Sequence, residues 1–115
     1  MRYIILSDIH ANYPALEEVA RIAERYRRNG HGVQFCCLGD VVGYGPLSGA
    51  LACLRWLRTS GASDFWFPGN HDDWIVQQVG RVADEALITL RSQHWYLQRE
   101  APDDWDWFAR RVNEL

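Results

Sequence analysis

Three short apolar runs, each ending in a cluster of polar residues, constrain the fold of this chain more than any other feature. The runs are rich in β-branched and aromatic residues, which is typical of buried strands, and they span residues 2–7, 33–38 and 65–67. Two amphipathic segments separate them. This alternation predicts an α/β fold in the order β-α-β-α-β, with parallel strands joined by right-handed crossovers and flanked by helices.

The segments between the runs carry the signals of helices. Asn12 can cap a helix that opens near Pro14, and Asn29-Gly30 provides its stop. A second apolar stripe with helical spacing begins at Leu47 and closes at Ser60-Gly61. We therefore expect one crossover helix after each of the first two strands.

The carboxyl-terminal part of the chain is predicted to be helical. From Asp73 onward the pattern is helical, with a break near Ala101-Pro102. We expect residues 82–115 to form a helical, cap-like segment that packs over the sheet or over the rim where the strands end. No linker interrupts the 115 residues, so residues 1–115 are predicted to be a single domain.

The polar clusters would converge, because the carboxyl ends of parallel strands meet at one edge of the sheet. Asp8 and His10 lie two apart on an extended segment and can reach the same ion. Asp40 follows the second run, and Asn70 and His71 follow the third. Gathered acids repel one another without a cation, and oxygen donors mixed with imidazole suit Mn, Fe, Zn or Mg. The clusters together predict a metal site.

Each cluster taken alone has a simpler interpretation. An Asp-x-His triplet is common by chance, and a Gly-Asp step such as Gly39-Asp40 is more often a turn. Asn70 or Asp72 can cap a helix by accepting hydrogen bonds from backbone amides. The ordered combination of three clusters, each directly after a predicted strand, favours the metal site.

The amino-acid composition excludes several classes of protein. With 48% hydrophobic and 23% charged residues the chain is predicted to be soluble and globular. Its net charge of −3 disfavours a nucleic-acid partner. No apolar run approaches the ~20 residues that cross a bilayer, and Tyr3 to Leu6 is too short for a signal-peptide core. We expect a cytoplasmic protein with no membrane partner. Its 3 cysteines lack a disulfide or zinc spacing and are predicted to be free thiols.

The polar clusters resemble those of the calcineurin-like metallophosphoesterases, and the continuation Gly-Tyr-Gly-Pro is similar to the small bacterial members. The similar segments, between residue 1 and about residue 74, are Asp8-Ile-His10-Ala-Asn12, Gly39-Asp-Val-Val-Gly43-Tyr-Gly-Pro46 and Gly69-Asn-His-Asp72. The resemblance implies the first half of a four-layer αββα sandwich. It also implies a two-metal hydrolase of phosphomonoesters or phosphodiesters.

The family roles carry over residue by residue. Asp8 and His10 would bind the first divalent ion, Asp40 would bridge both ions, and Asn70 would bind the second. His71 would stand beside the leaving-group oxygen as the proton donor. The resemblance therefore implies two divalent ions (Mn²⁺, Fe, Zn²⁺ or Mg²⁺) and a phosphorylated small molecule or nucleotide as substrate.

Two departures from the family pattern affect these expectations. Members that act as Ser/Thr protein phosphatases carry Asp and Arg where this chain has Gly43 and Tyr44, which disfavours that activity. The family also completes its site with a lone His and a Gly-His-x-His cluster, whereas His94 is the histidine that follows His71 here and is predicted to be a helical surface or packing residue. The chain thus resembles an amino-terminal half, an apparently truncated domain with weak or incomplete hydrolysis.

A second function from a different class stays open. Half of a sandwich leaves a sheet face and an edge strand bare, so the chain can instead be a non-catalytic binding or scaffolding module, or half of a split enzyme. Its partner would then be a second copy or a complementing carboxyl-terminal half, joined through the aromatic surface. A nucleotide-binding α/β domain is disfavoured, because neither GxGxxG nor a P-loop follows the first run.

Overall fold

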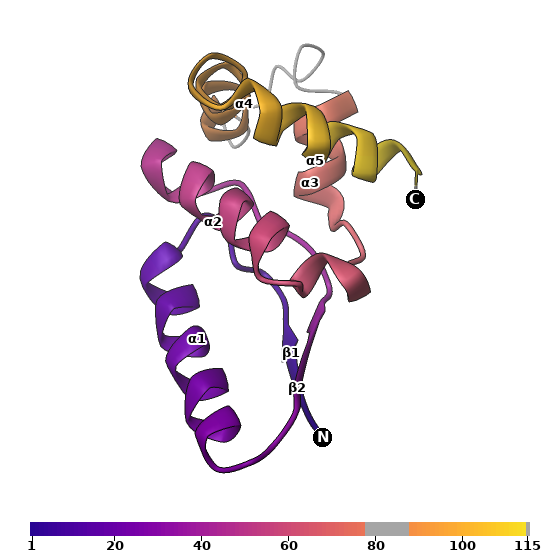
Figure 1. Ribbon diagram of the computed structural model, residues 1–115. Helices are drawn as coiled ribbons and strands as arrows, with labels where there is room; N and C mark the ends of the chain where they lie inside the picture. Colours follow the sequence, from indigo (N-terminus) through magenta and orange to yellow (C-terminus); the bar gives the residue numbers. More distant parts are fainter. Residues whose placement is uncertain (78–87, 115) are drawn as a thin grey trace.

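The amino-terminal part of the chain alternates strands and helices, and the carboxyl-terminal part is helical (Figure 1). A computed structural model describes residues 1–77 and 88–114. The elements in chain order are β1 (Arg2–Leu6), α1 (Tyr13–Arg28), β2 (Val33–Cys37), α2 (Leu47–Thr59), the 3₁₀ helix η1 (Ala62–Phe65), α3 (Asn70–Gln77), α4 (Ile88–Glu100) and α5 (Pro102–Glu114). The mixed α/β class is therefore confirmed.

The strands β1 and β2 pair in parallel, with α1 as the crossover between them. Their register runs from Arg2 opposite Val33 to Leu6 opposite Cys37. The predicted cap of α1 is confirmed, since the Asn12 side chain accepts a hydrogen bond from the Ala15 N–H at 3.2 Å. Both strands therefore end on the same side of the molecule and deliver the following loops to one rim.

The predicted third strand is not present as a strand in the described residues. The run at 65–67 begins inside η1, and Trp66 then forms one isolated parallel bridge with Cys37. The Phe67 N–H donates to the Cys37 carbonyl at 2.9 Å. Pro68, which has no N–H, follows directly, so the run is too short to extend the ladder. The observed sheet has two strands, and the third segment lies beside β2 in strand-like register.

The core lies between the strand pair and the helices. α4 contacts α2, α3 and α5, and α5 also contacts α2 and α3. Leu54, Leu97 and Phe108 are fully buried, and Trp66 stacks on Phe108 with ring centroids 5.5 Å apart. The helical prediction for residues 82–115 is confirmed over 88–114, with the break at Ala101, while its first residues lie outside the described part. Most of its aromatic side chains contribute to packing.

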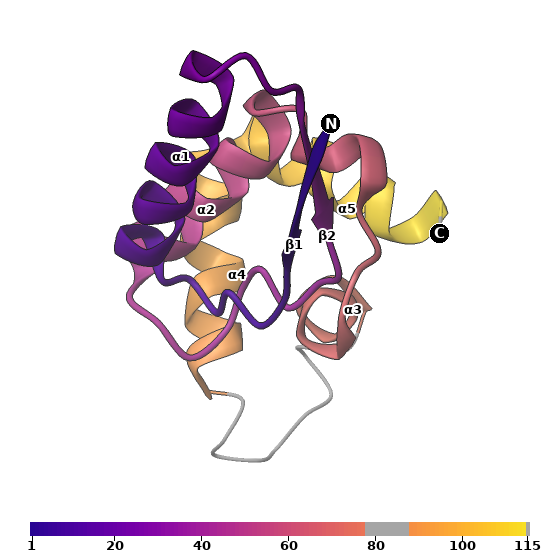
Figure 2. The same cartoon turned by 90° about the horizontal axis from the view of Figure 1, so that it is seen from below.

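One face of β1 is not covered by the described part of the chain. Side chains alternate along the strand: Ile4 and Leu6 pack against the core, whereas Tyr3 and Ile5 are 70% and 67% exposed. Figures 1 and 2 show α1 and α2 together on one side of the strand pair. Among the described helices none has the length and apolar character needed to cross a membrane.

Candidate metal centre

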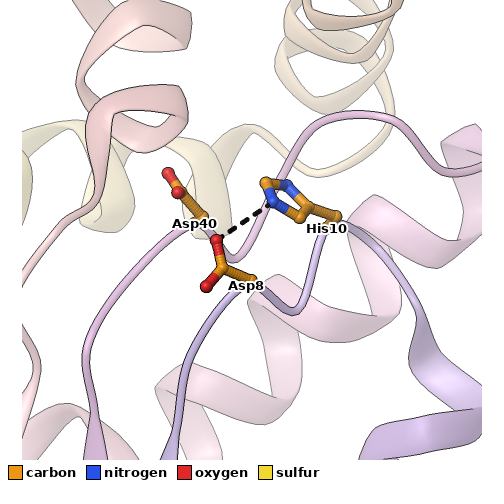
Figure 3. A group of neighbouring side chains, drawn as sticks. All are labelled: Asp8, His10 and Asp40. Carbon is orange, nitrogen blue, oxygen red and sulfur yellow. Dashed lines mark ion pairs between the residues drawn. The ribbon is translucent and has the colours of Figure 1, made fainter.

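Three of the predicted ligands meet where β1 and β2 end. One ligand atom each from Asp8, His10 and Asp40 lies within 4.8 Å of the others. The Asp8 Oδ1 and His10 Nε2 atoms are 3.4 Å apart, and Figure 3 shows these two side chains pointing toward each other with Asp40 beside them. The convergence predicted from parallel strands is therefore observed for these three residues.

The backbone that carries these three side chains is in an unusual conformation. Asp8, His10 and Asp40 have φ values of 54°, 47° and 56°, in the left-handed region that non-glycine residues rarely adopt. The two loops hold each other there: the Asp8 N–H donates to the Gly39 carbonyl at 3.1 Å and the His10 N–H to the Asp40 carbonyl at 2.8 Å. Backbone strain of this kind concentrates at binding and catalytic sites.

Local hydrogen bonds prepare two of the ligands for a cation. The Ser7 hydroxyl donates to the Asp8 carboxylate at 2.8 Å and, with His10, holds the pKa of Asp8 below its usual value. The His10 Nδ1 atom lies 3.2 Å from the Val42 carbonyl oxygen, which can only accept. The ring proton therefore belongs on Nδ1, and this leaves the Nε2 lone pair free to bind a metal beside Asp8.

Asn70 starts α3 at the edge of this centre. The residues on either side of it lie against Asp40: the His71 N–H donates to the Asp40 Oδ1 atom at 2.8 Å, and a Cβ added to Gly69 would lie 2.2 Å from the same oxygen. The Asn70 side chain is exposed. Its backbone is therefore beside the Asp40 carboxylate, while its part as a ligand stays a prediction.

His71 is buried among aromatic rings next to the three ligands. It stacks on Trp74 at 5.5 Å and contacts the rings of His10 and Tyr44 at 4.8 and 4.7 Å. Its Nδ1 atom is buried without a hydrogen-bond partner in the described structure, and a Cβ added to Gly43 would lie 2.3 Å from it. The lack of a side chain at Gly43 therefore leaves the room that the His71 ring occupies.

Burial sets the charge state of His71. Desolvation lowers the pKa of the imidazole, against the opposing effect of the Asp40 carboxylate. The neutral ring is therefore favoured near neutral pH, and it still carries one N–H that can be donated. His71 is therefore placed to give a hydrogen bond within the rim, and it can give a proton there only after it has taken one up.

Asp72 is a buried hydrogen-bond acceptor that connects two loops. From the sequence it was one of two candidate helix caps. It is fully buried, and its carboxylate accepts from the N–H groups of Val41 at 2.9 Å, Val42 at 3.3 Å and Gly69 at 3.0 Å. Burial raises its pKa to about 6, although these three hydrogen bonds act in the opposite direction. Asp72 therefore joins the loop after β2 to the start of α3.

Gln93 is a second residue that sequence reasoning missed. Its buried side chain reaches from α4 to the glycine loop, accepting from the Gly43 N–H at 2.7 Å and donating to the Gly45 carbonyl at 3.0 Å. No sequence motif marks it, because its role depends on a contact 50 residues away in the chain. The carboxyl-terminal helices thus support the rim without contributing a metal ligand in the described residues.

His94 is a packing residue, as predicted. Its Nδ1 atom lies 2.7 Å from the Ile75 carbonyl oxygen, and its ring meets Trp105 edge-on at 4.7 Å. It takes no part in the group formed by Asp8, His10 and Asp40.

The donor set fits a divalent cation of the kind expected. Two carboxylates and one imidazole nitrogen are hard or borderline ligands, and their close approach gathers negative charge that a cation would neutralise. The parallel strand pair brings these groups together at the carboxyl ends of its strands, where α/β folds commonly bind their ligands. The family comparison agrees: the model of the calcineurin-like phosphoesterases matches residues 1–113, and the chain belongs to that family.

The family match is longer than the resemblance read from the motifs. That resemblance ended near residue 74, whereas the match runs through α4 and α5 to residue 113. Among curated proteins and solved structures, no significant match to this chain is found. Family membership therefore rests on the matched model and on the ligands at the rim.

Proposed function

We propose that this protein hydrolyses a phosphate ester with the help of divalent metal ions. The observation that carries the proposal is the cluster of Asp8, His10 and Asp40, whose ligand atoms lie within 4.8 Å of one another. Membership in the calcineurin-like phosphoesterases supports it. The substrate would be a phosphomonoester or phosphodiester of a small molecule or nucleotide.

The ligands divide between two ions in this proposal. Asp8 and His10 would hold the first ion, Asp40 would bind both, and Asn70 would supply an amide oxygen to the second. Bound divalent ions would activate water and neutralise charge on the phosphoryl oxygens. Few protein ligands reach the second ion from the described residues, so we expect a low rate and a preference for Mn²⁺ or another ion that tolerates water ligands.

His71 would act on the leaving group. Attack of water on phosphorus would form one P–O bond and release a proton, and the ester P–O bond would break. The departing oxygen would take its proton from the imidazolium form of His71, and the proton released by the water would balance the one given. The His71 ring is held by Trp74 on one side, and its backbone N–H is tied to Asp40 at 2.8 Å. The ring can therefore keep one orientation while its N–H faces the leaving oxygen.

The test of this function is hydrolysis of bis(4-nitrophenyl) phosphate with Mn²⁺. Asp40→Asn keeps an oxygen that accepts from the His71 N–H but removes the bridging charge, so the rate should fall by about 100-fold or more, given that even outer-shell partners of metal sites are worth about 10–100-fold. Asp103→Asn, at an exposed aspartate of α5, is the matched control and should retain full activity. Equal rates for both variants would contradict the proposal.

The uncovered face of β1 favours a second candidate function, association with another protein surface. Tyr3 and Ile5 are 70% and 67% exposed, and within the described residues their strand pairs along one edge, with β2. Exposed apolar strands of this kind favour association with a partner. A second copy or a complementing half would cover this face. Ile5→Lys should then abolish self-association in analytical ultracentrifugation, whereas Ile88→Lys, at an exposed isoleucine of α4, should not.

A further inference from the structure

We propose that an apolar pocket beside the metal centre binds an uncharged aromatic group of the substrate, an inference that rests on the proposed phosphoesterase function. The pocket has a volume of about 690 Å³ and lies between the start of α1, the loop before α2 and the first turns of α2. Cavities of this size hold small organic ligands. Its place in the fold, its chemistry and its rigidity each support this assignment.

The pocket opens directly beside the metal ligands. His10, whose Nε2 faces Asp8, is also part of the pocket wall, and so is Tyr44. The His10 and Tyr44 rings meet at 5.0 Å, and Tyr44 also lies 4.7 Å from the His71 ring. A phosphoryl group at the ligands would therefore place its leaving oxygen near His71 and its organic group past Tyr44 into the pocket.

The residues that line the pocket disfavour a charged substrate group. Within residues 1–77 and 88–114, no Asp, Glu, Lys or Arg side chain lines the pocket, and His10 is its one ionisable imidazole. The wall includes Tyr13, Pro14, Pro46 and Ala52. A charged group would lose its hydration here without gaining an ionic partner, which is costly. A polyphosphate tail or a charged peptide is thus disfavoured, whereas a flat neutral ring can pack on the tyrosine and proline side chains.

The floor of the pocket is preformed. A Cβ added to Gly49 would lie 2.1 Å from the Ala11 carbonyl oxygen, and one added to Gly45 would lie 2.8 Å from the Ala11 side chain. The loop before α2 therefore lies tightly against the loop after β1, and small residues at the contact leave the hollow open. A rigid pocket loses little freedom when a ligand enters, which favours binding.

Tyr44 is the residue that would contact the aromatic group of the substrate and select for it. Its φ is 56°, an uncommon conformation for a tyrosine, and its side chain is 62% exposed at the boundary between the pocket and His71. The Gln93 side chain holds the neighbouring Gly43 and Gly45 in place. A bound ring would cover the exposed Tyr44 side chain and be oriented by it, so Tyr44 is assigned as a specificity residue.

The pocket is tested without metal or turnover by titrating 2-naphthol, a neutral aromatic alcohol, into the ¹⁵N-labelled protein. The backbone amide signals of Gly45 and Gly49 should shift to saturation. Ser48→Phe, at an exposed lining residue of α2, fills the pocket and should weaken binding about tenfold or more, and Ala52→Phe should do the same. Ser92→Phe, at an exposed serine of α4 outside the pocket, is the control and should bind as the parent does. Absent shifts, or shifts unchanged by both pocket variants, would overturn the proposal.

A second measurement separates this inference from the proposed function. With Mn²⁺, release of phosphate from 2-naphthyl phosphate and from methyl phosphate is compared. Ser48→Phe should raise KM for the naphthyl ester about tenfold and should change kcat/KM for the methyl ester much less, because a methyl group does not reach the pocket. If the parent protein hydrolyses neither ester but still binds 2-naphthol, the proposed hydrolase function is contradicted and the assignment of the pocket is not. Equal effects of Ser48→Phe on the two esters would overturn the assignment of the pocket.

Discussion

Asp8, His10 and Asp40 each adopt a left-handed backbone conformation, which costs a non-glycine residue about 1–2 kcal/mol. All three are also the residues whose side chains converge within 4.8 Å. Ala11 and Tyr44 share this conformation, so the left-handed backbone marks the two loops that form the rim and not the three ligands alone. The sequence predicted that these three side chains would meet, because strand ends can be read from apolar runs; the same prediction for Asn70 stays a prediction. It did not predict these dihedral angles, which depend on hydrogen bonds between two loops distant in the chain.

Asp72 is predicted to be the most costly single carboxylate to remove. Asp72→Ala would leave the N–H groups of Val41, Val42 and Gly69 buried without their acceptor, and each such loss costs about 1–3 kcal/mol. The free energy of unfolding should fall by about 3 kcal/mol or more in urea denaturation. Asp73→Ala, at the exposed neighbouring residue, should change it by less than about 1 kcal/mol. Similar values for the two variants would show that Asp72 does not join the loops.

At the scale of the elements, β1, α1, β2 and α2 follow from the sequence, whereas the third run does not. Caps and apolar periods are local signals, so Asn12 and the stripe from Leu47 marked their helices correctly. The run at 65–67 has strand composition, yet its length and the following Pro68 leave room for one bridge to Cys37. Whether such a short run forms a strand depends on how it pairs with its neighbour in the fold, and amino-acid composition does not contain this information.

Gln93 links the carboxyl-terminal helices to the glycine loop, and its removal tests that link. Gln93→Met keeps the volume of the side chain but leaves the Gly43 N–H and the Gly45 carbonyl without their partner. We expect a loss of about 2 kcal/mol in the free energy of unfolding, measured by urea denaturation. Gln98→Met, at an exposed glutamine of the same helix, is the control. A neutral Gln93→Met would mean that the loop holds its conformation without α4.

The contact between α2 and α5 should weaken in acid. Asp104 accepts from Arg55 at 3.0 Å and from Arg58 at 2.9 Å. Burial acts to raise the pKa of Asp104, but these two guanidinium groups outweigh it and hold the pKa below its usual value. Because the folded pKa is depressed, the stabilisation is complete above the unfolded carboxyl pKa of about 3.9 and is lost as the pH falls through the folded value.

The measurement for this contact is the difference in unfolding free energy between the parent and Asp104→Asn across pH. It should be about 1 kcal/mol at neutral pH and should shrink toward zero as the pH is lowered below about 4. Asp103→Asn provides the exposed control. A difference that stays constant into strong acid would contradict the assigned ion pairs.

At the scale of the whole molecule, the described chain forms a covered side and an uncovered side. Its helices enclose one core, and the sequence predicted both the helices and a bare sheet face. It predicted packing for the carboxyl-terminal aromatic residues and left a binding surface there as the alternative; Trp105 and Phe108 are buried, whereas Trp95 is 70% exposed. The exposed apolar side chains of β1 are the better candidates. Helical periodicity identifies which residues share a face, but only the packed structure shows which face is left over.

The thiols report on the integrity of the core. Burial raises the pKa of Cys37 to about 11 and that of Cys53 to about 12, so neither forms the reactive thiolate near neutral pH. Iodoacetamide at about pH 8 should leave both unmodified in the native protein and alkylate both in guanidinium, as read by mass spectrometry. Rapid native alkylation of Cys53 would show that α2 is not packed as described.

The central claim is that Asp8, His10 and Asp40 hold a divalent cation, and Mn²⁺ titration followed by electron paramagnetic resonance tests it most directly. The parent protein should bind Mn²⁺ saturably with a Kd below about 1 mM, and Asp40→Asn should weaken binding by about 100-fold while Asp103→Asn should not. Saturable binding that is equal in all three proteins, or no saturable binding in the parent, would contradict the account.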